Sequence, residues 1–179
     1  MTSNDQTEFD AEAAVGLRAR VGEYLTGGLD GRGLRVALAC ARFNGAITLR
    51  LAVAALDALG DAGVERADIA MAWAPGAFEL PLLARYFATG PRRADAVITL
   101  GAVIRGDTGH YEVVAGECAR GVQTVQLDTG VPVVFGVLTT NTVEQALERS
   151  RPDATNKGRE AALTALEMAS VIAQGSLAR

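Results

Sequence analysis

The strongest constraint on the fold of this chain is the alternation, from residue 34 onward, of short apolar runs with longer segments of helical spacing. The runs lie at 34–40, 69–74, 96–104 and 132–138 and are rich in Val, Ile, Leu and Ala. Continuous runs without polar alternation are typical of strands buried on both faces of a parallel sheet. The sequence therefore predicts an α/β fold, a three-layer αβα sandwich with a central four-stranded parallel sheet.

Helical segments are expected between and after these runs. Pro81 lies near the start of one segment, where a first helical turn tolerates proline, and Gly130 supplies the end of another. Thr142 and Gln145 have the spacing of a capping box, in which Thr caps a helix and Gln reaches back. Apart from the helix that begins at Thr142, the expected helices lie at about 47–58, 78–87, 114–125 and 156–174.

The first 32 residues differ from the rest of the chain. They begin polar and acidic, which is the wrong composition for a secretory signal, so we expect a cytoplasmic protein. A weak helical pattern from Ala11 to Tyr24 is followed by several glycines. We therefore predict an extended N-terminal arm at 1–32, ordered against a neighbour or free, and an α/β domain at 33–179.

The composition excludes several classes of function. Of the 179 residues, 17 are Lys or Arg and 21 are Asp or Glu, so the net charge is −4 and no nucleic-acid partner is expected. No apolar stretch reaches the roughly 18 residues of a membrane span, so no membrane partner is expected either. Cys40 and Cys118 lie in apolar patterns without metal-ligand spacing, which predicts reduced core residues and no metal site.

A ligand of an open parallel sheet binds beyond the carboxyl ends of the strands. Neither a dinucleotide-binding GxGxxG nor a Walker A loop follows the first run, which argues against NAD and ATP. The candidate site residues are instead those that follow the apolar runs, at 42–44, 75–79, 105–110 and 139–141.

Segment 101–110 passes from a buried run through a short turn into the start of a helix. Free backbone N–H groups and the positive end of the helix dipole suit a phosphate at such a turn. His110, the only histidine of the chain, lies in the first helical turn, where it can donate or accept a proton near neutral pH. The alternative is that Thr108 only caps the helix and His110 is a solvated side chain.

Two aromatic–polar pairs follow other runs and suit a flat heterocycle with polar edges. Phe43 precedes Asn44, which is also a common helix cap. Phe78 precedes Glu79, and the alternative there is a loop that turns into a helix, with Phe78 in the core and Glu79 favoured by the helix dipole.

Three cations cluster around the predicted turn between the last two helices: Arg149, Arg151 and Lys157. Cations near a helix end often only complement its dipole on a wet surface. The functional alternative is an anion clamp, with bidentate phosphate recognition by Arg and a point charge from Lys.

Residues 34–173 contain, in this order, a set of short motifs: Arg42-Phe43-Asn44, Pro75–Glu79, Leu100–His110, Gly136–Thr140, Glu144-Gln145-Ala146, Asn156-Lys157-Gly158 and Glu160-Ala161-Ala162. Together they resemble the lumazine synthases, which form 6,7-dimethyl-8-ribityllumazine in riboflavin biosynthesis. The resemblance implies a flavodoxin-like fold. It also implies a transferase that condenses 5-amino-6-ribitylaminopyrimidinedione with 3,4-dihydroxy-2-butanone 4-phosphate, without a cofactor.

The resemblance further implies a role for each site residue. His110 is the expected proton shuttle, and Phe43 is the expected stacking partner of the pyrimidine ring. The other expected substrate contacts are Asn44, Ala77 and Glu79 at the ribityl chain with Phe78 as an apolar face, Ala102, Val103 and Ile104 at the pyrimidine edge, and Asp107, Thr108 and Arg149 at the phosphate. Three residues match family positions that come from the adjacent subunit: Phe135, Arg149 and Lys157. The resemblance therefore implies a homo-oligomer with its sites between subunits, and the family suggests a homopentamer.

The chain departs from the family pattern in two segments and at one residue. Tyr111-Glu112-Val113 stands where the family has an aromatic–Asp–Tyr run, and 150–155 replaces a glycine-rich turn containing lysine. Asp107 lies beside the expected phosphate, so its carboxylate must point away from it. The alternative functions are a catalytically weak lumazine- or flavin-binding shell protein of the same family, and a flavodoxin-like electron carrier.

Overall fold

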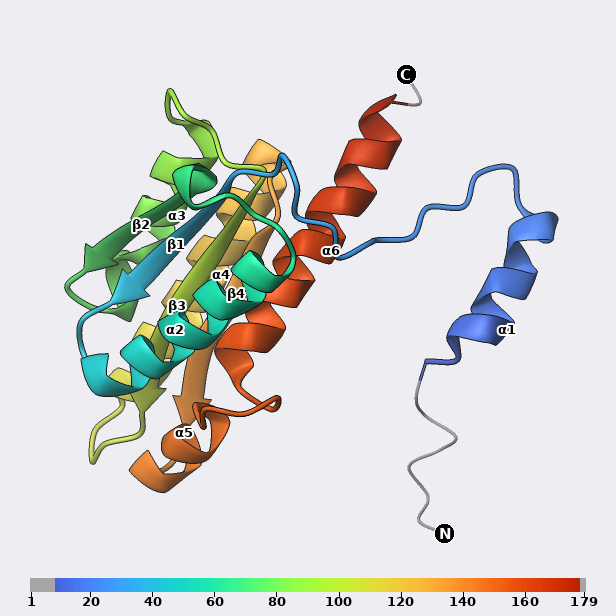
Figure 1. The fold of residues 1–179 in the computed structure, drawn as a ribbon. Helices are drawn as coiled ribbons and strands as arrows, with labels where there is room; N and C mark the ends of the chain where they lie inside the picture. The colour runs from blue at the N-terminus through green and yellow to red at the C-terminus, as the bar shows by residue number, and fades with distance from the viewer. Residues whose placement is uncertain (1–8, 178–179) are drawn as a thin grey trace, which may run out of the picture.

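A computed structural model describes residues 9–177 and confirms the α/β sandwich (Figure 1). One parallel sheet contains the four strands in the order β2-β1-β3-β4. The predicted runs 69–74 and 96–104 coincide with β2 and β3. The strands are β1 (Val36–Ala41), β2 (Ile69–Ala74), β3 (Ala96–Ile104) and β4 (Val133–Thr140).

Helices cover both faces of this sheet, as Figure 1 shows. On one face lie α2 (Gly45–Asp61) and α6 (Lys157–Leu177), and on the other lie α3 (Leu80–Thr89) and α4 (His110–Thr129). The short α5 (Val143–Arg149) follows β4. Single 3₁₀ turns lie at η1 (Leu17–Arg20), η2 (Arg66–Asp68) and η3 (Ala77–Glu79).

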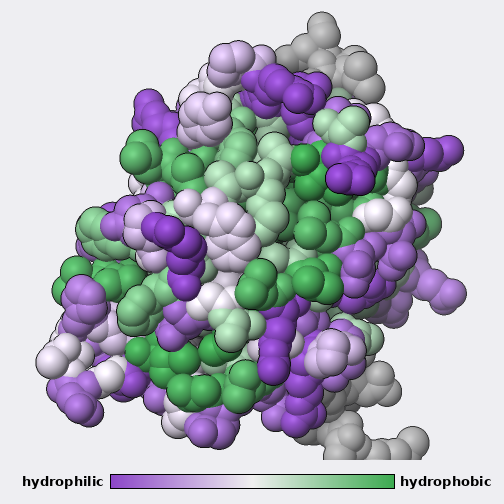
Figure 2. Space-filling view, turned by 60° about the vertical axis from the view of Figure 1, so that its left-hand side comes forward, coloured by the Kyte–Doolittle hydropathy of each residue, from purple (hydrophilic) through white to green (hydrophobic). Residues whose placement is uncertain are grey.

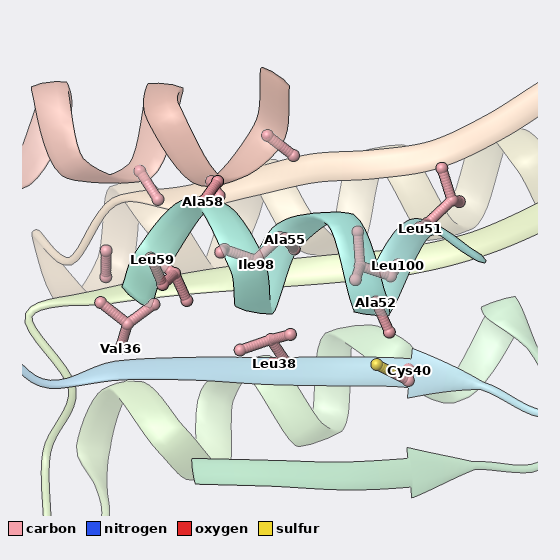
Figure 3. Close-up of a cluster of buried hydrophobic side chains, with 14 of the residues drawn as sticks. Val36, Leu38, Cys40, Leu51, Ala52, Ala55, Ala58, Leu59, Ile98 and Leu100 are labelled. Carbon is pink, nitrogen blue, oxygen red and sulfur yellow. The ribbon is translucent and has the colours of Figure 1, made fainter. Parts of the chain in front are cut away.

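Alternate residues of the central strands supply the two halves of the core, because side chains of a strand point to opposite faces of the sheet. Leu38 and Cys40 of β1 face α2 and α6, whereas Ala37 and Ala39 face α3 and α4. Figure 3 shows Val36, Leu38 and Cys40 of β1 on the side of the strand that faces α2, which carries small residues at Ala52, Ala55 and Ala58. These alanines let the helix lie close to the sheet.

The outer strand β2 departs from the expected burial on both faces. Met71 and Trp73 are partly exposed, whereas every residue of β1 is buried. The difference follows from the strand order, because β2 pairs only with β1 and leaves its other edge free within the described residues.

Most helix ends follow the predicted signals. Pro81 lies in the first turn of α3, and Gly130 ends α4 in the left-handed conformation with φ of 66°. Thr142 Oγ1 accepts a hydrogen bond from the N–H of Gln145 at 3.2 Å. Gln145 Oε1 accepts from the N–H of Asn141 at 2.9 Å, one residue before the partner that a capping box predicts.

The predicted helix of the arm ends early. α1 (Ala11–Gly16) continues only as the 3₁₀ turn η1, and α1 has no buried residue and stands apart from the sheet (Figure 1). From Thr26 the arm runs along α6. The carbonyl of Thr26 accepts a hydrogen bond from Gln174 Nε2 at 2.9 Å, and the N–H of Gly28 donates to Ser170 Oγ at 3.1 Å. Residues 1–8 of the arm lie outside the described residues.

Both cysteines are buried free thiols, as the sequence predicted. Burial raises the pKa of Cys40 to about 12 and that of Cys118 to about 11, from an ordinary value of 9.0. No helix among residues 9–177 is long and apolar enough to cross a membrane.

We expect the two thiols to resist alkylation by iodoacetamide at pH 8 in the folded protein and to react when it is unfolded. The folded chain holds their protons at higher pH than the unfolded chain does. The stability that this contributes is therefore present below pH 9 and declines as the pH rises toward the folded values. Mass spectrometry before and after denaturation measures the labelling, and labelling of the native protein would contradict the expected burial.

Candidate active site

A cleft of about 690 Å³ lies beyond the carboxyl ends of β1, β2 and β3, between η3 and the first turns of α4. This is the edge of the sheet at which the sequence placed a ligand. The cleft is lined by Phe43, Pro75, Gly76, Ala77, Phe78, Glu79, Ala102, Val103, Ile104, Gly106, Thr108, His110, Tyr111, Val113 and Val114. Most of the predicted site residues thus come together in one place.

Asn44 occupies the N-cap position of α2 but does not cap the helix with its side chain. Its backbone is left-handed, with φ of 56°, and its Nδ2 donates to the carbonyl oxygen of Ala102 at 2.9 Å. β1 ends at Ala41, so the Asn44 side-chain amide takes the place of a β1 backbone partner beside this part of β3. The bond fixes the turn that presents Phe43, and unusual backbone conformations of this kind cluster at ligand sites.

The two aromatic side chains of the cleft are exposed. Phe43 is 72% exposed and Phe78 is 53% exposed, so the alternative with Phe78 in the core is wrong. The Glu79 carboxylate accepts a hydrogen bond from the N–H of Gly76 at 3.0 Å, which holds the 75–79 turn in shape. One further acceptor oxygen of Glu79 remains available to a hydroxyl in the cleft.

The turn after β3 has the features that suit an anion. Within residues 9–177, the N–H groups of Gly106, Asp107, Thr108 and Gly109 have no hydrogen-bond partner, and all four residues are exposed. α4 begins at His110, so this residue lies in the first helical turn as predicted, and its N–H donates to Thr108 Oγ1 at 3.4 Å. Thr108 lines the cleft but is not the N-cap of α4, because that position is Gly109 and has no side-chain cap bond.

Asp107 and His110 differ in their relation to the cleft. The exposed Asp107 is not among the residues that line the cleft, which is the arrangement that a phosphate at the turn needs. The His110 side chain lines the cleft and is exposed. No three side chains of His, Cys, Asp or Glu in the described residues come together as metal ligands.

Arg105 lies between β3 and this turn and contacts both sides of it. Its Nη1 pairs with the carboxylate of Glu112, and its guanidinium lies 4.2 Å from the centre of the Tyr111 ring. Its Nε donates to Asn141 Oδ1 at 3.0 Å. The hydrogen bond from Arg105 lowers the pKa of Glu112 and raises that of the guanidinium, so both groups stay charged near neutral pH.

Phe135, Arg149 and Lys157 lie together in a second groove, of about 410 Å³, along β4, α5 and α6. The two grooves share no lining residue, so one chain does not unite all the predicted site residues. Arg149 Nη1 donates to the carbonyl of Gln145 at 3.1 Å, and Lys157 pairs with Glu160. β4 is an edge strand, which leaves this groove open at the margin of the sheet.

The unusual turn 150–155 is a compact structure of its own. Asp153 Oδ1 accepts from the N–H of Thr155 at 2.8 Å and from its hydroxyl at 2.6 Å, and these bonds lower the pKa of the carboxyl. The buried Asn156 donates to the carbonyl of Arg151 at 2.7 Å and accepts from the N–H of Gly158 at 2.8 Å. The turn therefore fixes the spacing between Arg149 and Lys157 without the glycines of the family pattern.

Some residues of the cleft escaped the sequence prediction. Tyr111, Val113 and Val114 line it from α4, within one helical turn of His110. Their proximity to His110 in the sequence was the signal that could have found them. Arg105 was noted after its strand, but its partners Glu112 and Asn141 lie 7 and 36 residues away, and no local pattern links the three.

A parallel sheet with a cleft at its carboxyl edge is the arrangement of α/β proteins that bind small molecules beyond their strands. Comparison with protein families matches residues 33–173 to 6,7-dimethyl-8-ribityllumazine synthase. The match covers most of the chain, and the protein belongs to this family. Membership supports a transferase function in riboflavin biosynthesis.

Proposed function

We propose that this protein condenses 5-amino-6-ribitylaminopyrimidinedione with 3,4-dihydroxy-2-butanone 4-phosphate to give 6,7-dimethyl-8-ribityllumazine, with release of phosphate and water. The observation that carries the proposal is the cleft at the carboxyl edge of the sheet. It combines exposed aromatic faces, an anion-binding turn and the single histidine of the chain. We place the reaction in the cytoplasm.

The cleft has a separate region for each part of the substrates. Phe43 stacks on the pyrimidine ring, whose edge meets Ala102, Val103 and Ile104. Asn44, Ala77 and Glu79 hold the ribityl chain, with Phe78 as an apolar wall. The N–H groups at Asp107 and Thr108 bind the phosphate, where the helix dipole of α4 favours negative charge.

The chemistry asks little of the protein beyond positioning and one proton carrier. The substrates bring their own amine and carbonyl, and phosphate is a good leaving group. Positioning supplies up to roughly 7–11 kcal/mol of such a barrier. His110 moves a proton from the attacking amine to the hydroxyl that leaves as water when the Schiff base forms, and it removes a C–H proton as phosphate leaves. No cofactor or metal takes part in this scheme.

The separation of the two grooves supports a site built between subunits. Phe135, Arg149 and Lys157 of one subunit complete the cleft of its neighbour, with Arg149 as the cationic partner of the phosphate. An apolar stripe formed by Phe78, Leu82 and Tyr86, spaced at i, i+4 and i+8, lies exposed beside the cleft. Figure 2 shows broad hydrophobic areas on the side that carries β2. We propose a homopentamer that covers them.

The substitution Leu82→Glu is expected to break this assembly. Leu82 is 72% exposed in the single chain and does not line the cleft, so the change places a charge in the proposed subunit contact without removing core packing. Native mass spectrometry should show smaller species with an unchanged circular dichroism spectrum. The exposed Leu127→Glu on α4 is a comparison for added charge alone, and wild-type assembly of Leu82→Glu would contradict the contact.

A second candidate is a lumazine- or flavin-binding shell protein with little activity, which the changed 150–155 turn favours. A turnover measurement with both substrates separates the two, because product formation is visible as the lumazine chromophore. The proposed function expects product at a rate far above the uncatalysed reaction. Tight lumazine binding with no product would support the second candidate and overturn the first.

A further inference from the structure

The side chain of Arg105 forms a bridge across the turn that carries His110. Its backbone N–H donates to the carbonyl of Thr140 at 2.9 Å, which fixes it to the end of β4. Its guanidinium contacts Asn141, Tyr111 and Glu112 at once. Two of these partners, Tyr111 and Glu112, directly follow His110 in the sequence.

These contacts close the turn into a ring. The chain leaves Arg105, passes the free N–H groups of 106–109 and His110, and returns to Arg105 through Glu112. Within the described residues, the N–H groups of the four exposed residues 106–109 donate no backbone hydrogen bond that would restrain the turn. Together with the bond from the His110 N–H to Thr108 Oγ1 at 3.4 Å, the bridge restrains how these N–H groups and the His110 imidazole are placed relative to each other.

Arg105 itself is not among the residues that line the cleft, so its guanidinium acts outside the space in which a substrate lies. The ion pair is half exposed, with 44% of the Arg105 side chain and 53% of the Glu112 side chain accessible. Pairs of this exposure add little to the free energy of unfolding. Overall stability is thus a weak reason for a side-chain bridge with three partners, and placement of the turn is a stronger one.

We propose that Arg105 is a positioning residue for the reaction, which with Glu112 holds the phosphate-binding turn and the His110 imidazole in register. The inference rests on the proposed function and extends it to residues outside the cleft lining. A displacement of about 1 Å at a reacting group can lower a rate about 100-fold. The bridge restrains a loop where such displacement is otherwise easy.

The first test measures kcat and KM for Arg105→Met and Glu112→Gln. Both variants are expected to lower kcat roughly 10- to 100-fold with little change in KM, and the double variant to lower it no further than either alone. Arg105→Lys, which keeps the charge but loses the Nε bond to Asn141, is expected to recover part of the rate. Glu117→Gln is the matched control, because Glu117 forms an exposed pair with Arg120 on the same helix at 3.4 Å.

Three results of these kinetic measurements would overturn the proposal. Wild-type kcat in Arg105→Met overturns the proposal. A raised KM for the butanone phosphate at unchanged kcat also overturns it, because Arg105 would then bind the phosphate itself. A fall in kcat that is matched by a large fall in melting temperature identifies a purely structural role and overturns it as well.

A second measurement does not depend on turnover. His110 is the only histidine, so ¹³C-histidine labelling gives one imidazole signal without further assignment. We expect inorganic phosphate to shift this signal in the wild type and in Glu117→Gln, and the shift to be lost or broadened in Arg105→Met. An equal shift in all three overturns the positioning role. If the wild type forms no product but this pattern of shifts holds, the proposed function is wrong, whereas the placement of His110 by Arg105 is supported.

Discussion

Replacement of His110 by alanine is expected to lower kcat roughly 100- to 10,000-fold, the range over which a positioned acid–base group accelerates proton transfer. KM for either substrate should change far less, because the aromatic faces and the phosphate-binding turn remain. His110 is exposed and starts α4, so the substitution removes no core contact. Steady-state kinetics with both substrates, followed at the lumazine chromophore, measure the effect.

Two controls make the His110 result specific. Imidazole added to the buffer should restore part of the rate in His110→Ala, because the cleft is open, and should leave the wild type unchanged. Diethyl pyrocarbonate should inactivate the wild type in proportion to modification of its single histidine. Turnover by His110→Ala at the wild-type rate would remove the proton-shuttle role and leave positioning as the whole of the catalysis.

The strands were the most predictable part of this molecule. Runs 69–74 and 96–104 coincide with β2 and β3 because each apolar run is bounded by residues that break the pattern, such as Asp68 and Pro75. The arm was less predictable. Its helical pattern extends to Tyr24, but α1 ends at Gly16 and has no buried residue. Without packing against the domain, a weak propensity does not sustain a helix.

Many residues that line the cleft were predictable from the sequence, but their contacts were not. Position after a strand is enough to place Phe43, Glu79 and His110 in one cleft, because parallel strands end at a common edge. The partner of Asn44 was not predictable, since its side chain bonds a carbonyl 58 residues away in place of the helix end beside it. A local pattern carries no information on such distant partners.

The second large effect is expected from Gly158→Ala, which should destabilise the fold by about 3 kcal/mol or more, at the upper end of overpacking effects. Gly158 lies in the first turn of α6, and a Cβ there would be 2.0 Å from the carbonyl oxygen of Leu51 and 2.6 Å from its carbonyl carbon. Both atoms belong to the backbone of α2, so no side-chain rotation relieves the clash. Denaturant titration measures the loss.

The same helix offers the matched control, because Gly175→Ala makes the same substitution where the nearest atom to the new Cβ is Leu25 Cδ1 at 3.6 Å. That distance is ordinary contact, so the better helix propensity of alanine should stabilise the protein by about 0.5–1 kcal/mol. Opposite signs for the two variants would show that close approach of α6 to α2 requires glycine at 158. The α6 shift should also move Lys157, so Gly158→Ala at permissive temperature should raise KM for the butanone phosphate. Unchanged stability in Gly158→Ala would mean that the two helices can separate at little cost, contrary to the close approach of Gly158 to the backbone of Leu51.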